Sequence, residues 1–218
     1  MATYYKYLSF GEDGSICRDR TMSVFRENKL YMPFYHVLND PMEAYYEGSS
    51  LTASQIQELK STKQAIRICC LSKSHTDMLM WSHYGDGHKG CCIEVEINPI
   101  SSPACKRRVI KYVPNIQAPQ GCNSYERSID ILRKKLLPWQ YEQEVRFLRN
   151  SAIDDDEYLK VKIKKVYLGC HLEYRQVEEF SQLINGVRVL QPHIEIEQLQ
   201  RGQLTYWKNK RNPNKPIL

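Results

Sequence analysis

The sequence predicts a single mixed α/β domain over residues 1–218, in which helices flank a central mixed sheet. The chain has 218 residues, of which 42% are hydrophobic, and this is enough to build one domain with a sizeable core. Strand-like and helix-like segments alternate along it, without internal repeats or a long low-complexity linker. We therefore expect one core, followed by a basic tail at 208–218.

Strands are predicted where β-branched and aromatic residues gather or where apolar and polar residues alternate. These segments are 3–9, 29–32, 66–72, 91–97, 108–113, 144–149, 159–169, 187–190 and 193–197. In 91–97 the odd-numbered residues are apolar and should face a core, whereas Cys92 and two glutamates face the other way. The acidic run 154–157 is predicted to form an exposed hairpin tip.

Helices are predicted over 54–62, 76–84, 125–137 and 173–184. Pro138 should end the third of these helices, and the Asn-Gly pair at 185–186 is a typical C-terminal signal for the fourth. The second helix should begin at the Ser74-x-x-Asp77 pattern and should bury Trp81 in the core.

A glycine-rich stretch, "GDGHKG" at 85–90, matches the G-x-G-x-x-G pattern of dinucleotide-binding loops. Such a loop needs a strand before it and a helix after it, so that helix amides meet the pyrophosphate. Here the order is reversed, because a predicted helix precedes the glycines and a strand follows them. The stretch is therefore predicted to be a helix C-cap and a turn.

Charge and cysteine content narrow the function classes. The formal net charge is +6, and basic residues gather at 105–108, 133–135, 160–165 and in the tail. Such stretches either recruit nucleic acid or form an ordinary solvated surface. Two adjacent cysteine pairs without a signal peptide favour reduced thiols and a cytoplasmic protein. No apolar run is long enough to cross a membrane.

Histidine and aromatic residues surround the glycine-rich stretch. Trp81 is best explained as core, whereas His83 and His88 are either surface residues or binding groups on a loop. A zinc site that adds Cys91 and Cys92 is disfavoured, since adjacent cysteines on a strand point to opposite faces. We therefore predict no metal site.

Two other polar motifs are candidates for function. In "LNDPMEA", 38–44, Pro41 is interpreted as structural, and Asn39 and Glu43 as functional. Glu142 and Glu144 stand two apart at the start of a predicted strand, which would put both carboxylates on one face. The alternative is a charge ladder with Arg146, or a helical pair between Glu142 and Arg146.

Together these blocks resemble the bacterial domain of unknown function 2971 family. The resemblance rests on Asn39-Asp40-Pro41-x-Glu43, on "MWSHYG-x-x-HKG" at 80–90 and on "YE-x-E-x-R" at 141–146, and it spans most of residues 4–169. Members of this family are often encoded among phage-defence or stress genes.

The order of the blocks is in turn similar to that of ADP-ribosyltransferases, with a late Glu-x-Glu. That resemblance implies a transferase or toxin that consumes NAD as its substrate, with Glu144 stabilising an oxocarbenium-like state and Glu142 acting on the acceptor. It assigns NAD binding to Lys6, Tyr7, Asn39, Trp81, Ser82, His83, Tyr84 and His88. The first strand carries Tyr5-Lys6-Tyr7 instead of an Arg or His motif, and the middle block lacks Ser-Thr-Ser.

The resemblance also implies partners. The acceptor would be nucleic acid or protein, and an antitoxin or sensor protein would regulate the enzyme. The alternative function is a nucleic-acid-binding or nuclease-like effector, in which the basic stretches hold a backbone and the histidines and glutamates act on phosphodiesters. Dependence on a divalent metal ion would separate the two functions.

Overall fold

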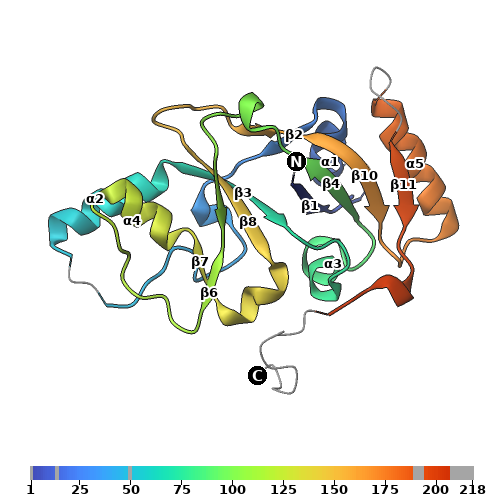
Figure 1. Cartoon of the computed structure of the whole chain (residues 1–218). Coiled ribbons are helices and arrows are strands. Elements are labelled where there is room, and N and C mark those ends of the chain that lie inside the picture. The colour runs from blue at the N-terminus through green and yellow to red at the C-terminus, as the bar shows by residue number, and fades with distance from the viewer. Residues whose placement is uncertain (1, 13–14, 49–50, 189–193, 207–218) are drawn as a thin grey trace.

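The computed structural model of the chain describes residues 2–12, 15–48, 51–188 and 194–206. This part of the chain forms one mixed α/β domain on a seven-stranded sheet (Figure 1), which confirms the predicted fold class. Helices α2 and α4 lie together beyond one end of the sheet, and α1 and α5 pack together near the other. The predicted basic tail at 208–218 lies outside the described residues.

The elements were largely found at their predicted positions. The strands are β1 (Thr3–Leu8), β2 (Lys29–Tyr31), β3 (Ile66–Ser72), β4 (Cys91–Glu96), β5 (Lys106–Val109), β6 (Lys111–Val113), β7 (Lys134–Leu136), β8 (Glu144–Asn150), β9 (Tyr158–Lys160), β10 (Lys162–Leu168) and β11 (Glu195–Gln198). The helices are α1 (Ile16–Glu27), α2 (Ala53–Gln64), α3 (Met78–Tyr84), α4 (Ser124–Ile131) and α5 (Tyr174–Val187), with short 3₁₀ turns η1 (Tyr35–Val37), η2 (Pro99–Ser101), η3 (Leu137–Glu142) and η4 (Arg201–Gln203).

The main sheet has the strand order β11-β10-β4-β1-β3-β8-β5. Its neighbouring strands are antiparallel except β10 and β11, which run parallel. The predicted strands at 66–72, 91–97 and 144–149 therefore share one sheet, as expected. Two short ladders, β2 with β9 and β6 with β7, lie outside it. Because β9 pairs with β2, the acidic run 154–157 connects two different sheets and is not a hairpin tip.

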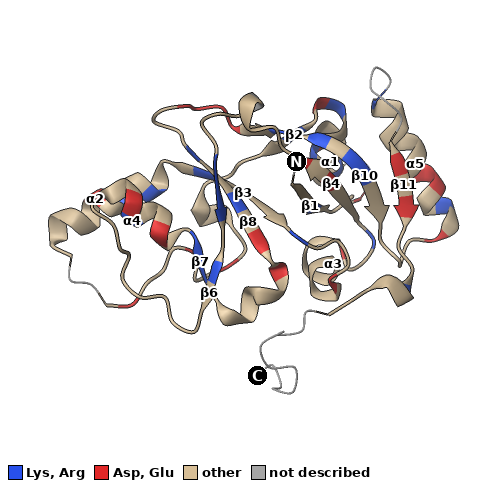
Figure 2. Ribbon diagram, viewed as in Figure 1, with Lys and Arg blue, Asp and Glu red and all other residues tan. Residues whose placement is uncertain are grey.

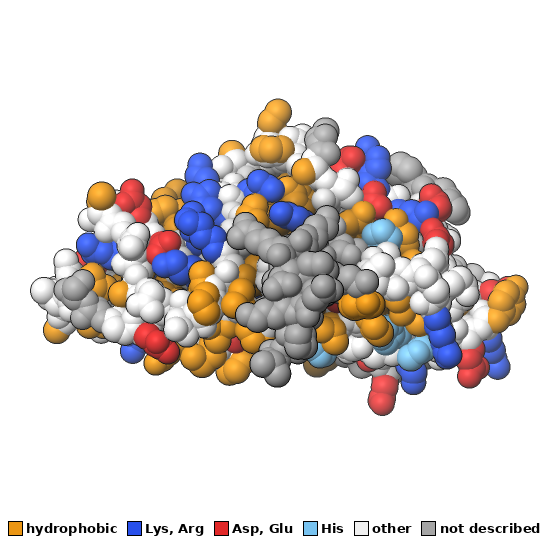
Figure 3. Space-filling model, turned by 60° about the horizontal axis from the view of Figure 1, so that its bottom comes forward, with side chains coloured by type: hydrophobic (Ala, Val, Ile, Leu, Met, Phe, Trp, Pro, Cys, Tyr) orange, Lys and Arg blue, Asp and Glu red, His pale blue; other side chains and the backbone are white. Residues whose placement is uncertain are grey.

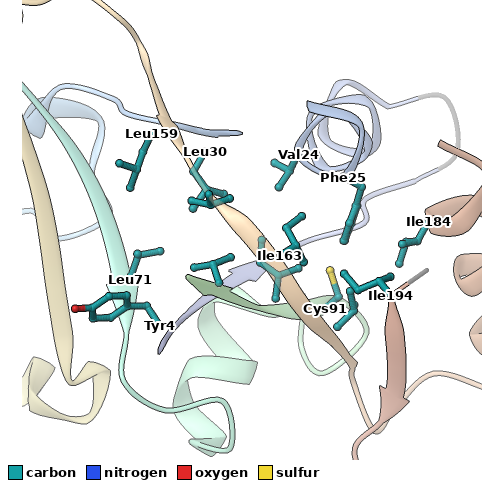
Figure 4. Close-up of a cluster of buried hydrophobic side chains, with 14 of the residues drawn as sticks. Tyr4, Val24, Phe25, Leu30, Leu71, Cys91, Leu159, Ile163, Ile184 and Ile194 are labelled. Carbon is teal, nitrogen blue, oxygen red and sulfur yellow. The ribbon is translucent and has the colours of Figure 1, made fainter. Parts of the chain in front are cut away.

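The largest apolar cluster lies between the sheet and helices α1 and α5 (Figure 4). Phe25 of α1 and Ile184 of α5 point toward Cys91 and Ile163 of the sheet. Ile93 and Val95 belong to the same cluster, whereas Cys92 packs on the opposite face with Trp81, as the alternation in 91–97 predicted. Two smaller clusters lie under α4 and under α3.

Helix α1 was not predicted. Its sequence, "ICRDRTMSVFRE", mixes charged and β-branched residues, so its helical periodicity is weak. Ser15 caps its first turn by accepting a hydrogen bond from the amide of Arg18, and Asn28 ends it with a left-handed φ of 52°. Burial of Met22 and Phe25 stabilises the helix in the fold, so packing outweighs local propensity.

Some of the predicted boundaries were wrong. Helix α4 ends at Ile131, well before Pro138, because 134–136 leave the helix and pair with β6. The segment 108–113 divides between β5 and β6, which join different ladders. Residues 187 and 188 end α5 instead of starting a strand, and the rest of 187–190 lies outside the described residues.

The glycine-rich stretch follows α3 and precedes β4, as predicted. Asp77 caps α3 by accepting from the amides of Leu79 and Met80, and Gly85 ends the helix. A Cβ on Gly90 would lie 2.3 Å from a carbonyl oxygen of β1, so this position requires glycine. The stretch is a C-cap and a turn, and its amides do not begin a helix. Within the described residues no helix has the length and apolar character that a bilayer span requires.

Candidate active site

A pocket of about 130 Å³ lies between β1 and β3, where the sheet is least tightly joined. Strand β1 pairs with β4 along its length but is registered with β3 at Tyr5 alone among the described residues. Side chains bridge the remaining gap. The Lys6 ammonium donates to the carbonyl of Cys70 at 3.2 Å, and the Tyr7 hydroxyl donates to the carbonyl of Ser74 at 3.0 Å. The splayed strands thereby leave room for a ligand beside polar groups.

Arg146 of β8 organises the charged wall of this pocket. Its Nε and Nη2 donate to the two carboxylate oxygens of Glu144 at 2.7 and 3.1 Å. Its Nη1 and Nη2 donate to the two oxygens of Glu43 at 2.6 and 2.7 Å, and Nη1 also donates to the carbonyl of Leu132. The three side chains are at most 5% exposed. Two fork-like pairs therefore fix both carboxylates.

Lys135 bridges the two glutamates of the predicted Glu-x-Glu motif. Its ammonium lies 2.5 Å from Glu142 Oε2 and 3.5 Å from Glu144 Oε2, and only 7% of its side chain is exposed. Strand β7 presents it through its parallel pairing with β6, and Figure 2 shows the basic residues of β7 beside the acidic start of β8. The predicted helix over 125–137 would have placed Lys135 differently, so the β6–β7 pairing helps to build the site.

A hydrogen-bonded chain leads from this buried cluster to the surface. The Tyr84 hydroxyl donates to Glu142 Oε1 at 2.7 Å, and the exposed Asn39 donates from Nδ2 to the Tyr84 oxygen at 3.4 Å. Helix α3 supplies Tyr84, and the "LNDPMEA" segment supplies Asn39. Both oxygens of Glu142 are therefore partnered, one by a phenol and one by an ammonium.

The two glutamates have opposite electrostatic environments. Burial raises the pKa of Glu142 above its ordinary value of 4.5, although Lys135 opposes the effect. Burial would also raise the pKa of Glu144, but Arg146 and Lys135 outweigh it and hold this pKa at about 2. Neighbouring carboxylates whose pKa values are pushed apart can take different roles, one as a proton-transfer group and the other as a permanent negative charge.

The geometry of the motif differs from the prediction. Glu142 ends the η3 turn and Glu144 begins β8, so the two carboxylates do not share a strand face. Gln143 between them has a left-handed φ of 47°, which reverses the chain locally. Arg146 pairs with Glu144, as the charge-ladder alternative predicted, and the helical pair between Glu142 and Arg146 is not formed.

Six of the predicted site residues line the pocket. These are Lys6, Tyr7, Asn39, Tyr84, Glu142 and Glu144. They come from β1, the "LNDPMEA" segment, α3, η3 and β8, so the three motif blocks and the first strand meet at one place. Glu43, also interpreted as functional from the sequence, lines the pocket as the partner of Arg146.

The other four predicted residues lie outside the pocket lining. Trp81 is fully buried and donates from Nε1 to a backbone carbonyl. Ser82 Oγ lies 3.1 Å from His88 Nε2, and His83 Nδ1 lies 2.8 Å from the Tyr141 hydroxyl. Neither histidine therefore lines the pocket with Glu142 and Glu144, although His83 bonds Tyr141, which is next to Glu142 in the chain.

Sequence reasoning missed Lys135 and Asp40 as pocket residues. Lys135 was interpreted as part of a basic surface stretch, and no local pattern indicated that it would be buried against Glu142. Asp40 stood in a recognised motif beside Asn39, so that motif was the available signal. Among the described residues no group of three or more His, Cys, Asp or Glu could hold a metal ion.

Part of the basic stretches within the described residues is engaged in ion pairs. Several of their cations are paired with carboxylates: Lys134 with Asp130, Lys135 with Glu142, and Lys165 with Glu195 and Glu197. On the face shown in Figure 3, some Lys and Arg side chains gather in a stripe on one side, and the others are interspersed with polar, acidic and apolar side chains. The pairing of Lys134, Lys135 and Lys165 with carboxylates favours a structural or solvated role for these cations over contact with a polyanion.

A family model matches part of the chain. Residues 80–147 match the model described as "Protein of unknown function (DUF2971)", which supports the family predicted from the motifs. The matched segment supplies Tyr84, Lys135, Glu142, Glu144 and Arg146, whereas β1 and the Asn39–Glu43 motif lie before it. No curated protein and no solved structure matched the chain.

Proposed function

We propose that the protein consumes NAD, as an ADP-ribosyltransferase or an NAD glycohydrolase, at the pocket between β1 and β3. The observation that carries this proposal is the pair Glu142 and Glu144, held by one lysine at a pocket wall with pKa values shifted in opposite directions. Cleavage of an N-glycosidic bond needs a fixed negative charge near the ribose and a group that moves a proton.

Glu144 is suited to the first role. Its pKa of about 2 keeps it ionised at neutral pH, and its two bonds to Arg146 hold it in place. When the bond from the ribose carbon to the nicotinamide nitrogen breaks, its electron pair leaves on nicotinamide and positive charge develops on the ribose. A preorganised carboxylate stabilises that charge without having to reorient.

Glu142 is suited to the second role. An oxygen nucleophile, from water or from a macromolecular acceptor, forms the new bond to the ribose carbon, and Glu142 takes the proton that this oxygen loses. The raised pKa of Glu142 makes it a stronger proton acceptor than an exposed glutamate. Lys135, which contacts both carboxylates, couples the two groups.

The rest of the pocket fits one ring better than a whole dinucleotide. Its volume of about 130 Å³ is below the range of roughly 300–1,000 Å³ that is typical for complete ligands. Tyr7, Leu71, Met80 and Tyr84 supply flat and apolar surface for a nicotinamide ring. The Lys6 ammonium donates one hydrogen bond to the carbonyl of Cys70. Its remaining N–H donors suit the pyrophosphate of NAD, which would extend out of the pocket.

The test is nicotinamide release from NAD by purified protein, with and without a chelator. We expect nicotinamide release that the chelator does not inhibit. Glu142→Gln should lower its rate on the order of a hundredfold or more. Glu178→Gln, on the exposed face of α5, is the matched control and should have no effect. Free ADP-ribose as product would indicate hydrolysis, and label carried onto nucleic acid or protein would identify the acceptor class. Absence of release, or equal release by Glu142→Gln, would contradict the proposal.

We further propose that NAD consumption serves a defence or toxin role in the cell, with an antitoxin or sensor protein as the partner. It is supported by the nature of the proposed reaction, since loss of NAD stops growth. Its test is expression of the wild-type protein and Glu142→Gln in bacteria, with growth and NAD content as the measurements. Arrest that is equal for both proteins would argue against it.

A further inference from the structure

Asp40 is a buried acid of the pocket wall with one oxygen unused. The residue is 4% exposed and lines the same pocket as Glu142 and Glu144. Its Oδ1 accepts from the amide of Met42 at 2.9 Å, and its carbonyl accepts from the amide of Glu43 at 3.0 Å. Both bonds close the turn that follows Asn39 and set the orientation of the Asp40 side chain.

The second carboxylate oxygen, Oδ2, is buried and has no hydrogen-bond partner among the described residues. A buried polar atom without a partner is costly, so it is a natural contact for a donor that a ligand brings. The two cations of the charged cluster are not available to it, because Lys135 is paired with Glu142 and Arg146 with Glu43 and Glu144.

The charge balance of the pocket points in the same direction. Four acidic residues line it, Asp40, Glu43, Glu142 and Glu144, against the three cations Lys6, Lys135 and Arg146. Formal charges therefore leave one negative charge over. A ligand group that enters the pocket is favoured if it is cationic or offers N–H donors, and it is disfavoured if it is anionic. We call this group the head group.

We infer that Asp40 is the residue that selects the ligand's head group, and that its Oδ2 accepts a hydrogen bond from the carboxamide of nicotinamide. This inference rests on the proposed function, because it takes NAD as the ligand. Asp40 would then discriminate against nicotinate, which differs from nicotinamide at that one group and carries a carboxylate at neutral pH. The pyridinium charge of NAD also suits the net negative wall.

The test is Asp40→Asn, studied with free nicotinamide and free nicotinate by ligand-observed NMR at neutral pH. Asparagine keeps the Oδ1 acceptor of the turn and replaces Oδ2 by an amide donor. We expect the wild-type protein to prefer nicotinamide by about tenfold or more, and Asp40→Asn to lose or reverse that preference. Asp19→Asn on the exposed surface of α1 is the matched control and should bind as the wild type does.

Thermal unfolding of Asp40→Asn shows whether the turn survives, and Asp40→Ser, which retains a turn acceptor without the amide, is the second variant. The inference is supported if the wild-type protein prefers nicotinamide and both variants lose that preference, even if NAD is not cleaved. Two results would overturn the role of Asp40 but leave the proposed function standing, provided that NAD is cleaved. One is equal binding of nicotinamide and nicotinate by the wild-type protein. The other is an unchanged preference for nicotinamide in both folded variants. Absence of both nicotinamide binding and NAD cleavage overturns both.

Discussion

Arg146→Met should destabilise the protein far more than an ordinary loss of surface charge. The side chain is 1% exposed and makes five hydrogen bonds, to Glu144, Glu43 and the Leu132 carbonyl. Methionine fills similar space but leaves two buried carboxylates without their main cation. Breaking a buried ion pair from one side costs about 3–5 kcal/mol. Solvent cannot compensate, since both carboxylates are at most 5% exposed.

The measurement is urea unfolding, followed by tryptophan fluorescence, together with the melting temperature. For a chain of this size about 3–5 kcal/mol corresponds to a decrease of roughly 10 °C. Arg149→Met is the matched control, because Arg149 lies on the same strand and is 2% exposed. Its partners Asp154 and Asp156 are 36% and 44% exposed, so water can solvate them when the arginine is lost. We expect a clearly smaller cost for this control.

The pH dependence of the Arg146→Met effect gives a second check. In the wild-type protein the pKa of Glu144 is lowered to about 2, so its ionisation contributes stability above pH 4.5 and loses it as the pH falls toward 2. In the variant, burial without Arg146 raises this pKa, and the folded state then gains from protonation at low pH. The difference in unfolding free energy between the two proteins should therefore shrink from pH 7 to pH 4. A cost below about 1 kcal/mol at pH 7, or one independent of pH, would refute this reasoning.

Three further predictions concern the same site and its support. Tyr84→Phe removes a hydrogen bond that lowers the pKa of Glu142, so the acid limb of the pH–rate profile should move to higher pH. An unchanged profile would exclude Glu142 as the base. Lys135→Met should cost about 3 kcal/mol or more in a denaturant titration, whereas Arg133→Ala, which removes a partly exposed pair at 3.6 Å, should cost less than about 1 kcal/mol. Equal costs would show that Lys135 is not structural. Gly90→Ala should destabilise by about 1–3 kcal/mol in thermal unfolding, because its Cβ would meet a β1 carbonyl oxygen at 2.3 Å, and wild-type stability would show that the loop relaxes freely.

Much of the sheet could be predicted from local sequence. The segment 66–72 coincides with β3 and 91–97 nearly coincides with β4, because apolar and β-branched residues there match a strand that is buried on one or both faces. The glycine-rich stretch was also correctly interpreted, since its order after a helix and before a strand is a local property. Helix α1 could not be found in this way, as its propensity is weak and its stability comes from Phe25 packing in the core.

The candidate site could be predicted only as a set of residues. Glu142, Glu144 and Tyr84 were identified from motifs, and the structure brings them to one pocket. The same reasoning assigned His83 and His88 to the site, although their helix and turn keep them out of the pocket lining. Sequence proximity to a motif does not determine the direction of a side chain once the backbone turns between a helix and a strand.

The sequence by itself determined the fold class, the strand faces, the turn chemistry of 85–90 and the identity of the acids, because these depend on composition and on spacing within a few residues. Only the tertiary structure decided which charges pair. Arg146 meets Glu43 across 103 positions of the chain, and Lys135 reaches Glu142 only because 134–136 leave their predicted helix to pair with β6. Burial then raises the pKa of Glu142, whereas Arg146 and Lys135 outweigh burial and lower the pKa of Glu144, and both burial and ion pairing are properties of the whole fold.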